Sequence, residues 1–200
     1  MPPAGRPRTF DRDEALKKAM LVFWEKGYEG TTMSDLISTI GMKAPSVYAA
    51  FGNKDALFNE VLGLYNGIVK EGPLKALHEN AHILEAIKQS MHENISIFTS
   101  PNNPSSCLVM TAAINCTPEN TRHVEKLKDV RADYKGAIKA RLSKAAEEGQ
   151  LVEAANIESL AEFYTTFIHG LAMRARDGST NSELSASCEY ALLPLKAALK

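Results

Sequence analysis

His78 and His82 have the types and the spacing of metal ligands. The stretch His78-Glu-Asn-Ala-His82 matches H-E-x-x-H, in which two histidines one helical turn apart ligate zinc and the glutamate acts as a general base. The context argues against an enzyme, because the match closely follows Gly72-Pro73, no histidine stands six residues beyond His82, and no sheet is predicted to shape a peptide cleft. A zinc metallopeptidase is therefore the least favoured interpretation. We expect no enzyme and no cofactor, and two interpretations stay open: an exposed pair of histidines, or a regulatory metal site.

Cys107 is a second candidate for chemistry. It follows the polar break Pro101-Asn-Asn-Pro-Ser-Ser, so it can lie at the electropositive start of a helix, where the pKa of a thiol falls and its reactivity rises. The alternative is a buried thiol that packs as a small hydrophobe. Cys116 is a poor disulfide partner, because one helix spanning both residues would separate them by about 13 Å on opposite faces. A redox- or electrophile-responsive regulator is thus one alternative function.

The composition predicts a folded chain. Of the 200 residues 44% are hydrophobic, and 23 Lys and Arg balance 24 Asp and Glu to a formal net charge of −1. This excludes an intrinsically disordered protein and gives no global hint of a nucleic-acid or membrane partner. The longest apolar run, residues 19–24, is far shorter than the roughly 20 residues that span a bilayer. With no signal-peptide core in residues 1–10 and three cysteines, an odd number, we expect a cytoplasmic protein in a reducing compartment.

The secondary-structure elements that position His78, His82 and Cys107 are predicted to be helices. No segment shows the strict alternation of apolar and polar residues that marks a half-buried strand. The expected fold class is all-α. Asp11 and Gly27 delimit a first helix, and Thr32 with Asp35 caps a second that Gly41 ends. A third runs from residue 44 or 45 to 51, and a longer one begins at residue 54. Two short helices joined by a glycine turn and braced by a longer helix form a helix-turn-helix unit.

At residues 27–58 the sequence, GYEGTTMSDLISTIGMKAPSVYAAFGNKDALF, resembles the DNA-binding domain of the TetR family of bacterial transcriptional regulators. The matching features are Gly27-Tyr28 before Thr31-Thr32, Ile37, Gly41, Val47-Tyr48, Phe51, Lys54 and Leu57-Phe58. The resemblance implies an N-terminal three-helix helix-turn-helix DNA-binding domain, residues 1–55. It also implies a larger C-terminal helical effector-binding and dimerisation domain, residues 56–200.

The charge distribution of the N-terminal region is compatible with DNA. From Leu36 to Lys54 there are two lysines and no carboxylate, and residues 1–10 hold two arginines and no acid. Positive charge of this kind attracts phosphates, although two lysines are equally compatible with a plain solvated face. The partner implied by the resemblance is a double-stranded DNA operator.

The expected DNA contacts follow from these positions. Exposed small or basic residues of the third helix would enter the major groove, and residues at helix starts would meet phosphates. Tyr48 would contact a phosphate by resemblance to the family, or else be a half-buried core aromatic. The arm around residues 5–8 would reach the minor groove, or else be a solvated tail. The predicted DNA-binding residues are Arg6, Arg8, Thr32, Lys43, Ala44, Pro45, Ser46, Tyr48, Ala49 and Lys54.

Two amphipathic helices, residues 153–177 and 182–199, are expected near the C-terminus, with Pro194 kinking or ending the second. In proteins of this family the last two helices pair with those of a second subunit. The resemblance therefore implies a homodimer, in which recognition helices about 34 Å apart engage successive turns of a pseudo-palindromic operator. The predicted interface residues are Leu160, Tyr164, Leu171, Cys188, Leu192 and Leu195.

The resemblance also implies release of DNA by an unknown small-molecule effector that binds among residues 80–175 and shifts the helix starting at Lys54. Each apolar residue in this region is alternatively plain core. The predicted effector-binding residues are Met91, Phe98, Cys107, Met110, Ile114, Tyr134, Phe163 and Phe167. The function expected is that of a one-component transcriptional regulator, with a repressor favoured over an activator.

Overall fold

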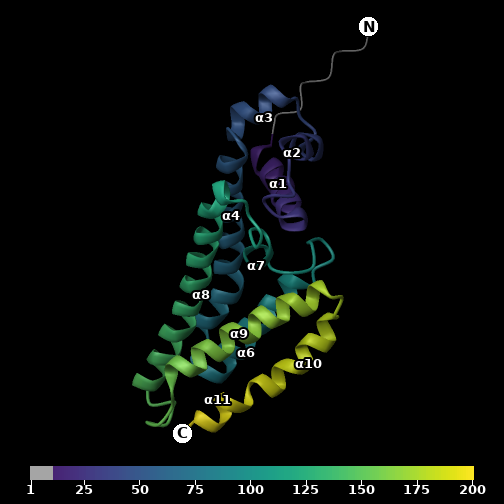
Figure 1. Cartoon of the computed structure of the whole chain (residues 1–200). Helices are drawn as coiled ribbons and strands as arrows, with labels where there is room; N and C mark the ends of the chain where they lie inside the picture. The colour runs from purple at the N-terminus through teal and green to yellow at the C-terminus, as the bar shows by residue number, and fades with distance from the viewer. Residues whose placement is uncertain (1–10) are drawn as a thin grey trace.

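The computed structural model describes residues 11–200, and the regular structure within that range is helical (Figure 1). This confirms the all-α fold class. The N-terminal helices are α1 (Arg12–Lys26), α2 (Met33–Ile40), α3 (Ala44–Phe51) and α4 (Lys54–Val69). They are followed by the π-helical turn η1 (Lys70–Leu74), α5 (Lys75–Glu79), α6 (Ile83–Phe98), α7 (Leu108–Thr111), the short turn η2 (Pro118–Asn120), α8 (Thr121–Glu147), α9 (Ile157–Arg176), α10 (Asn181–Ala191) and α11 (Leu193–Ala198). No helix of the described residues is long and apolar enough to cross a membrane.

The boundaries of the first helices follow from short local signals. The Asp11 carboxylate accepts hydrogen bonds from the backbone N–H groups of the first turn of α1. Thr32 and Asp35 form the predicted capping box of α2, and Gly41 ends this helix in the left-handed conformation, with φ of 79°. Pro45 lies in the first turn of α3, where its missing N–H costs nothing. The predicted helix-turn-helix elements are therefore confirmed.

The core is divided into two clusters, and Ile97 and Cys107 pack against both of them. The N-terminal cluster holds the inner faces of α1–α3, extends along α4 as far as Tyr65, and also includes Leu108 and Leu127 from beyond residue 100. The second cluster joins α6, α8, α9 and α10. In Figure 1, α4 leaves the three-helix tip and descends beside α8 toward the second cluster. Because the N-terminal cluster continues along α4 to Tyr65, past the predicted boundary, the division between residues 55 and 56 stays a prediction.

The two predicted C-terminal helices are present with different bounds: the first begins at Ile157 and not at residue 153, and the second is divided into α10 and α11. α9 is capped by Asn156, and the residue pair Thr180 and Glu183 forms a capping box that starts α10. The last helical stretch is broken between Ala191 and Leu193, and Pro194 lies in the first turn of α11. The predicted kink at Pro194 is thus confirmed.

His78 and His82 are both exposed, as one interpretation expected, but they do not lie on one helix. His78 lies in the last turn of α5, Asn80 is extended, and His82 caps the start of α6. The chain turns here because Arg141, which is 3% exposed, donates hydrogen bonds to the carbonyl oxygens of Leu77, Asn80 and Ala81. Gln150 donates to Ala81 as well, so the carbonyl groups at the end of α5 are bound by side chains from α8 and beyond. No group of three metal-ligating side chains occurs among residues 11–200.

Replacing Arg141 by methionine should lower the free energy of unfolding by about 2–4 kcal/mol, because buried carbonyl groups lose charge-assisted hydrogen bonds. Chemical denaturation measures this. Lys144→Met, at an exposed position of the same helix, is the control and should change the value by less than about 0.5 kcal/mol. Equal stability of the two variants would contradict a structural role for Arg141.

Candidate nucleic-acid interface and effector cavity

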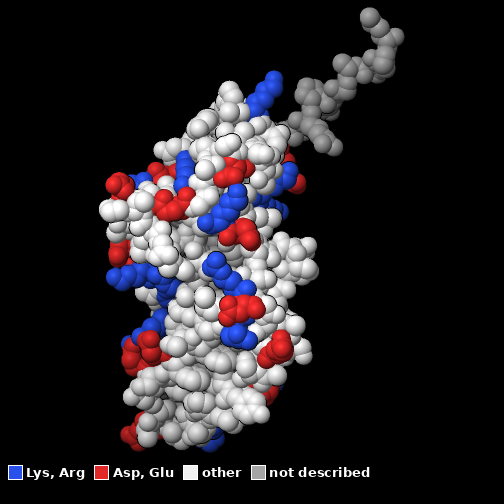
Figure 2. Space-filling view, turned by 45° about the vertical axis from the view of Figure 1, so that its right-hand side comes forward, with Lys and Arg blue, Asp and Glu red and all other residues white. Residues whose placement is uncertain are grey.

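The surface of α3 is the candidate nucleic-acid interface. Val47 and Phe51 are buried, so the opposite side of the helix is left accessible. Of the predicted contact residues on this helix, Ala44 is half-buried, whereas Lys43, Pro45, Ser46, Tyr48 and Ala49 are exposed. Tyr48 has an exposed fraction of 48%, which argues against the alternative of a half-buried core aromatic. The tip of the molecule, where α3 lies, shows no acidic side chain in Figure 2.

The other side chains predicted to contact DNA already have partners within the protein or lie outside the described residues. The Thr32 hydroxyl is exposed but donates to Asp35, so a phosphate would compete with that carboxylate. Lys54 is half-buried, and its ammonium group lies 4.1 Å from the centre of the Tyr28 ring in a cation–π contact. Arg6 and Arg8 lie outside the described residues.

Asp55, in the first turn of α4, attaches the N-terminal helices to α8. Its Oδ1 atom accepts hydrogen bonds from the Tyr28 hydroxyl, from Arg122 at 2.7 Å and from the ring of His123 at 2.7 Å. Because Arg122 and then Tyr28 donate to the carboxylate, the pKa of Asp55 lies well below its usual range. His123 is 2% exposed and packs against the rings of Tyr28 and Phe58. We call Tyr28, Asp55, Arg122 and His123 the Asp55 cluster.

A second contact joins the same helices to α7. Gly27, with φ of 72°, ends α1, and a Cβ atom at this position would lie 3.2 Å from the carbonyl oxygen of Ala112. The next residue, Tyr28, donates its backbone N–H to that oxygen. Glycine is therefore required at residue 27 both for the backbone conformation and for the close approach of the chain after α7.

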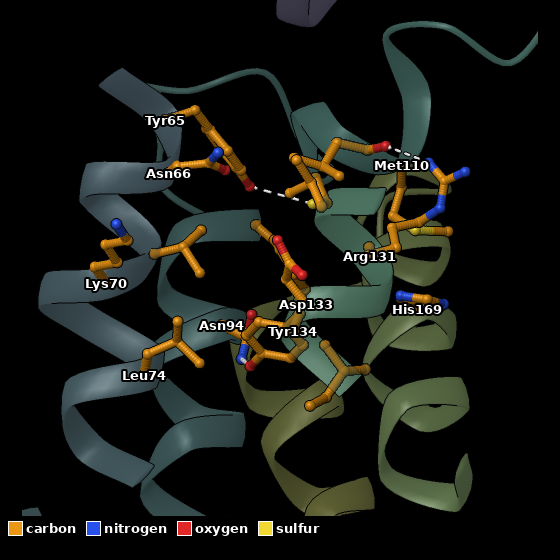
Figure 3. Close-up of a pocket in the computed structure, with 17 residues that line it drawn as sticks. Tyr65, Asn66, Lys70, Leu74, Asn94, Met110, Arg131, Asp133, Tyr134 and His169 are labelled. Carbon is orange, nitrogen blue, oxygen red and sulfur yellow. Dashed lines mark hydrogen bonds between the residues drawn. The ribbon is translucent and has the colours of Figure 1, made fainter. Parts of the chain in front are cut away.

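A cavity of about 230 Å³ lies among α4, η1, α6, α7, α8 and α9 (Figure 3). Its walls are mostly apolar, with a few polar groups, a combination typical of small-molecule sites. Four predicted effector-binding residues line it, namely Phe98, Cys107, Met110 and Tyr134. The lining residues that sequence reasoning missed are Tyr65, Asn66, Val69, Lys70, Leu74, Asn94, Val109, Val130, Arg131, Asp133, Ile168, His169 and Ala172.

Four other residues predicted to bind the effector do not line this cavity. Met91 is buried in the second core cluster, and Ile114 is 58% exposed in the segment after α7. Phe163 and Phe167 stack on each other, with ring centroids 6.2 Å apart, toward the outer side of α9. These four stay predictions without support from this cavity, because apolar type alone did not reveal which face of each element points toward it.

Cys107 is the N-cap residue of α7, and of the two alternatives for this thiol the structure favours the unactivated one. Burial raises the pKa of this thiol, although the Tyr65 hydroxyl donates a hydrogen bond to its sulfur at 3.3 Å. The helix that follows has only four residues, so its dipole is weak. His169, on the cavity wall, has a pKa lowered by burial and then by the nearby Arg131, which favours the neutral ring.

The six predicted dimer residues need a correction. Leu160, Tyr164, Leu171, Cys188, Leu192 and Leu195 are all buried in the second core cluster of this chain. They form the inner faces of α9–α11, and the exposed apolar side chains on these helices are instead Phe163, Met173, Tyr190 and Leu193, with exposed fractions of 38%, 43%, 76% and 57%. A groove between α9 and α10 adjoins them, with Gly170 and Ser187 in its lining. Figure 2 shows a broad uncharged area in the lower part of the molecule, where these helices lie.

Two family models match this sequence. Residues 15–61 match "Bacterial regulatory proteins, tetR family", and residues 84–188 match "Tetracyclin repressor-like, C-terminal domain". The HTH-type transcriptional repressor ComR of Escherichia coli (strain K12) is 32% identical over 181 residues, which cover 90% of this chain and 86% of ComR. The repressor BdcR of the same strain is 24% identical over 196 residues, which cover 98% of this chain and 94% of BdcR.

Solved structures share the fold over nearly the whole length. A cysteine variant of the TetR family transcriptional regulator CifR, complexed with 26-bp operator DNA, is 36% identical, with a TM-score of 0.87 over 94% of this chain and 98% of CifR. AibR, solved with isovaleryl coenzyme A and operator DNA, is 18% identical, with a TM-score of 0.72 over 92% of this chain and 98% of AibR. At that identity AibR supports the fold alone.

Replacing Asp55 by asparagine should lower the free energy of unfolding by about 1–2 kcal/mol at pH 5, because three donors lose a charged acceptor. Since folding lowers the pKa of Asp55, its contribution is complete above the pKa of an unfolded aspartate, about 3.9, and is lost as the pH falls below that value toward the folded pKa. Denaturation of both proteins at about pH 5 and pH 3 should therefore give a smaller difference at the lower pH. Glu125→Gln, at an exposed position of α8, is the control, and an equal effect there would contradict the role of Asp55.

Proposed function

The chain belongs to the TetR family of bacterial transcriptional regulators, and from this premise we propose that it is a repressor that binds a pseudo-palindromic operator as a homodimer. A small molecule in the cavity releases it from DNA. The observation that carries this proposal is the exposed surface of α3, which has no acidic side chain. The Asp55 cluster attaches the N-terminal helices to the start of α8, and residues further along α8 line the cavity.

The arrangement at α3 suits entry into a major groove. Its exposed side chains are small apart from Tyr48 and Lys43, so the helix backbone can approach the base edges. Lys43 and Tyr48 supply a cation and a hydroxyl for phosphates, which position the protein without specifying sequence. The 36%-identical CifR structure holds operator DNA, which supports DNA as the partner of this chain.

A second copy of the chain is the proposed partner of the α9–α10 face. Phe163, Met173 and Tyr190 leave apolar area exposed there. The space outside Gly170, which has no side chain, is open, so another helix can approach closely. Exposed apolar patches of this kind mark protein–protein interfaces. Pairing through this face would hold two copies of α3 at the spacing of successive turns of DNA.

The effector signal has two physical routes to α3. Tyr65 and Val69 of α4 line the cavity, and Asp55 lies in the first turn of the same helix. On the other side of the cavity Val109 lies in α7, and the residue after that helix, Ala112, accepts the hydrogen bond from Tyr28. A ligand that displaces α4 or α7 thus moves the N-terminal helices as a unit, and a coupling of about 1–3 kcal/mol per site is enough to release DNA.

Specific binding to the intergenic DNA upstream of its own gene tests the function. We expect a gel shift that excess non-specific DNA does not abolish and that weakens steeply with salt. Lys43→Ala should weaken binding to all sequences and reduce the salt slope by about 1 per subunit, and Tyr48→Phe should cost up to about tenfold in affinity.

Lys139→Ala, far along α8 and paired with Glu158, is the matched control and should bind DNA as the wild type does. If the wild type gives no specific shift on any upstream fragment, the repressor proposal fails. If Lys43→Ala and Lys139→Ala bind equally well, the assignment of α3 as the interface fails.

Replacing Phe163 by glutamate should convert the homodimer into a monomer, because a carboxylate would be buried without a partner. Light scattering should give about twice 21.8 kDa for the wild type and 21.8 kDa for the variant. Ile114→Glu places the same charge at another exposed apolar residue and should stay dimeric. A monomeric wild type at micromolar concentration would contradict the proposal.

A further inference from the structure

The chemical class of the effector can be narrowed from the cavity walls; this step rests on the function proposed above. A dry cavity of about 150 Å³ holds benzene. The present cavity, of about 230 Å³ and partly open to solvent, therefore encloses the volume of a molecule moderately larger than benzene. A nucleotide or a long acyl chain would not fit within this volume.

Two neighbouring polar side chains at the deep side of the cavity are incompletely hydrogen-bonded. Asn94 is 4% exposed, and its Nδ2 atom donates to Ser90 O at 2.8 Å and to the Tyr134 hydroxyl at 2.7 Å. Its Oδ1 atom accepts no hydrogen bond from the described residues. In Figure 3 this oxygen points up from the floor of the cavity toward its centre. This oxygen is accessible from the cavity and has free acceptor capacity, so a ligand in the cavity can donate a hydrogen bond to it.

Tyr134 completes the pair. Its hydroxyl accepts from Asn94, whereas its own proton has only Ser90 Oγ within reach, at 3.5 Å, the outer limit of a hydrogen bond. The proton is therefore available to an acceptor atom in the cavity. Burial raises the pKa of Tyr134, so the hydroxyl keeps this proton at neutral pH. The cavity therefore presents one hydrogen-bond acceptor, Asn94 Oδ1, next to one donor, the Tyr134 hydroxyl.

The charged side chains of the cavity lining lie away from Asn94 and Tyr134. Lys70 and Asp133 are exposed and carry opposite charges, and Arg131 donates to the carbonyl oxygen of Val109. No cation among the described residues pairs with Asn94 or Tyr134 at the deep end. A carboxylate placed there would lose its hydration and face the Asn94 oxygen, which is unfavourable.

We propose that the cavity binds a small, uncharged, mostly apolar molecule with one hydroxyl group, an alcohol or a phenol. The ligand hydroxyl donates to Asn94 Oδ1 and accepts from the Tyr134 hydroxyl. The apolar body lies against Val69, Phe98 and Ile168. Hydroxyl groups suit this pair because they donate and accept through one oxygen atom.

The test measures binding of phenol, toluene and benzoate to the full chain by calorimetry, at concentrations up to about 10 mM. Trp24 gives a second readout, because it is the only tryptophan and its ring packs edge-on against Tyr65, with centroids 4.9 Å apart. Phenol should bind and benzoate should bind at least tenfold more weakly. Undetectable phenol binding, or tighter binding of benzoate, would overturn the proposal; the second result would favour a carboxylate near Lys70 and Arg131.

Variants of the cavity separate the contribution of the two hydrogen bonds to ligand affinity from the contribution of cavity size. Tyr134→Phe and Asn94→Leu should each lower the ratio of phenol affinity to toluene affinity by about tenfold, because toluene makes neither hydrogen bond. Met110→Leu, on the apolar wall, is the control and should leave the ratio unchanged. Retained toluene binding establishes that a variant is folded, and Tyr134→Phe suffices if Asn94→Leu is unstable. An unchanged ratio in a folded Tyr134→Phe variant would overturn the proposal.

A gel shift with the same compounds distinguishes this proposal from the function on which it rests. Absence of operator binding without ligand overturns the repressor function, while the calorimetric pattern still supports the hydroxyl site. Operator release by phenol and not by benzoate supports both. Phenol binding with the expected ratios but without DNA release supports the site and overturns its role as the effector site.

Discussion

The position of the DNA-binding helices depends on one carboxylate. Asp55 Oδ1 accepts from the Tyr28 hydroxyl, from Arg122 and from His123, so the segment after α1, the start of α4 and the start of α8 converge on one atom. The carboxylate also lies in the first turn of α4, where the helix dipole favours negative charge. Since His123 is buried between the rings of Tyr28 and Phe58, the cluster is both polar and packed. A change in the distance between α4 and α8 must therefore strain or break it.

The helix that holds Asp55, α4, also reaches the cavity. Tyr65 lies ten residues after Asp55, which is about 15 Å along a helix. Its hydroxyl meets Cys107 at the cavity wall, and its ring packs against Trp24 of α1. One side chain thus contacts the cavity and the N-terminal core at once. Because close-packed side chains transmit small displacements rather than absorb them, a ligand needs no large conformational change to alter the position of α1.

The sequence predicted the features that local physics determines. The Thr32–Asp35 capping box, the left-handed Gly41 and the break at Pro194 depend on neighbours within about four residues, and the structure has all three. It could not predict features set by distant residues. Arg141, 59 positions after His82, ends the helix that would have paired His82 with His78. The Cys107 thiol is half-buried beside Tyr65, 42 positions earlier, and loss of solvation, not the helix terminus, decides the direction of its pKa shift.

The two faces of α9 show why sequence periodicity pointed to residues on the inner side of the helix as interface residues. The inner face packs Tyr164 and Leu171 into the core and presents Ile168 to the cavity, while the outer face exposes Phe163 and Met173. A helix that only covered a monomer core would carry polar residues on its outer side. Apolar residues on both sides are expected when a helix lies between its own core and a partner, and sequence periodicity cannot tell which side is which. Because the cavity and the proposed dimer face share this rigid helix, a ligand that moves Ile168 also moves Phe163, so cavity occupancy and subunit spacing are physically linked.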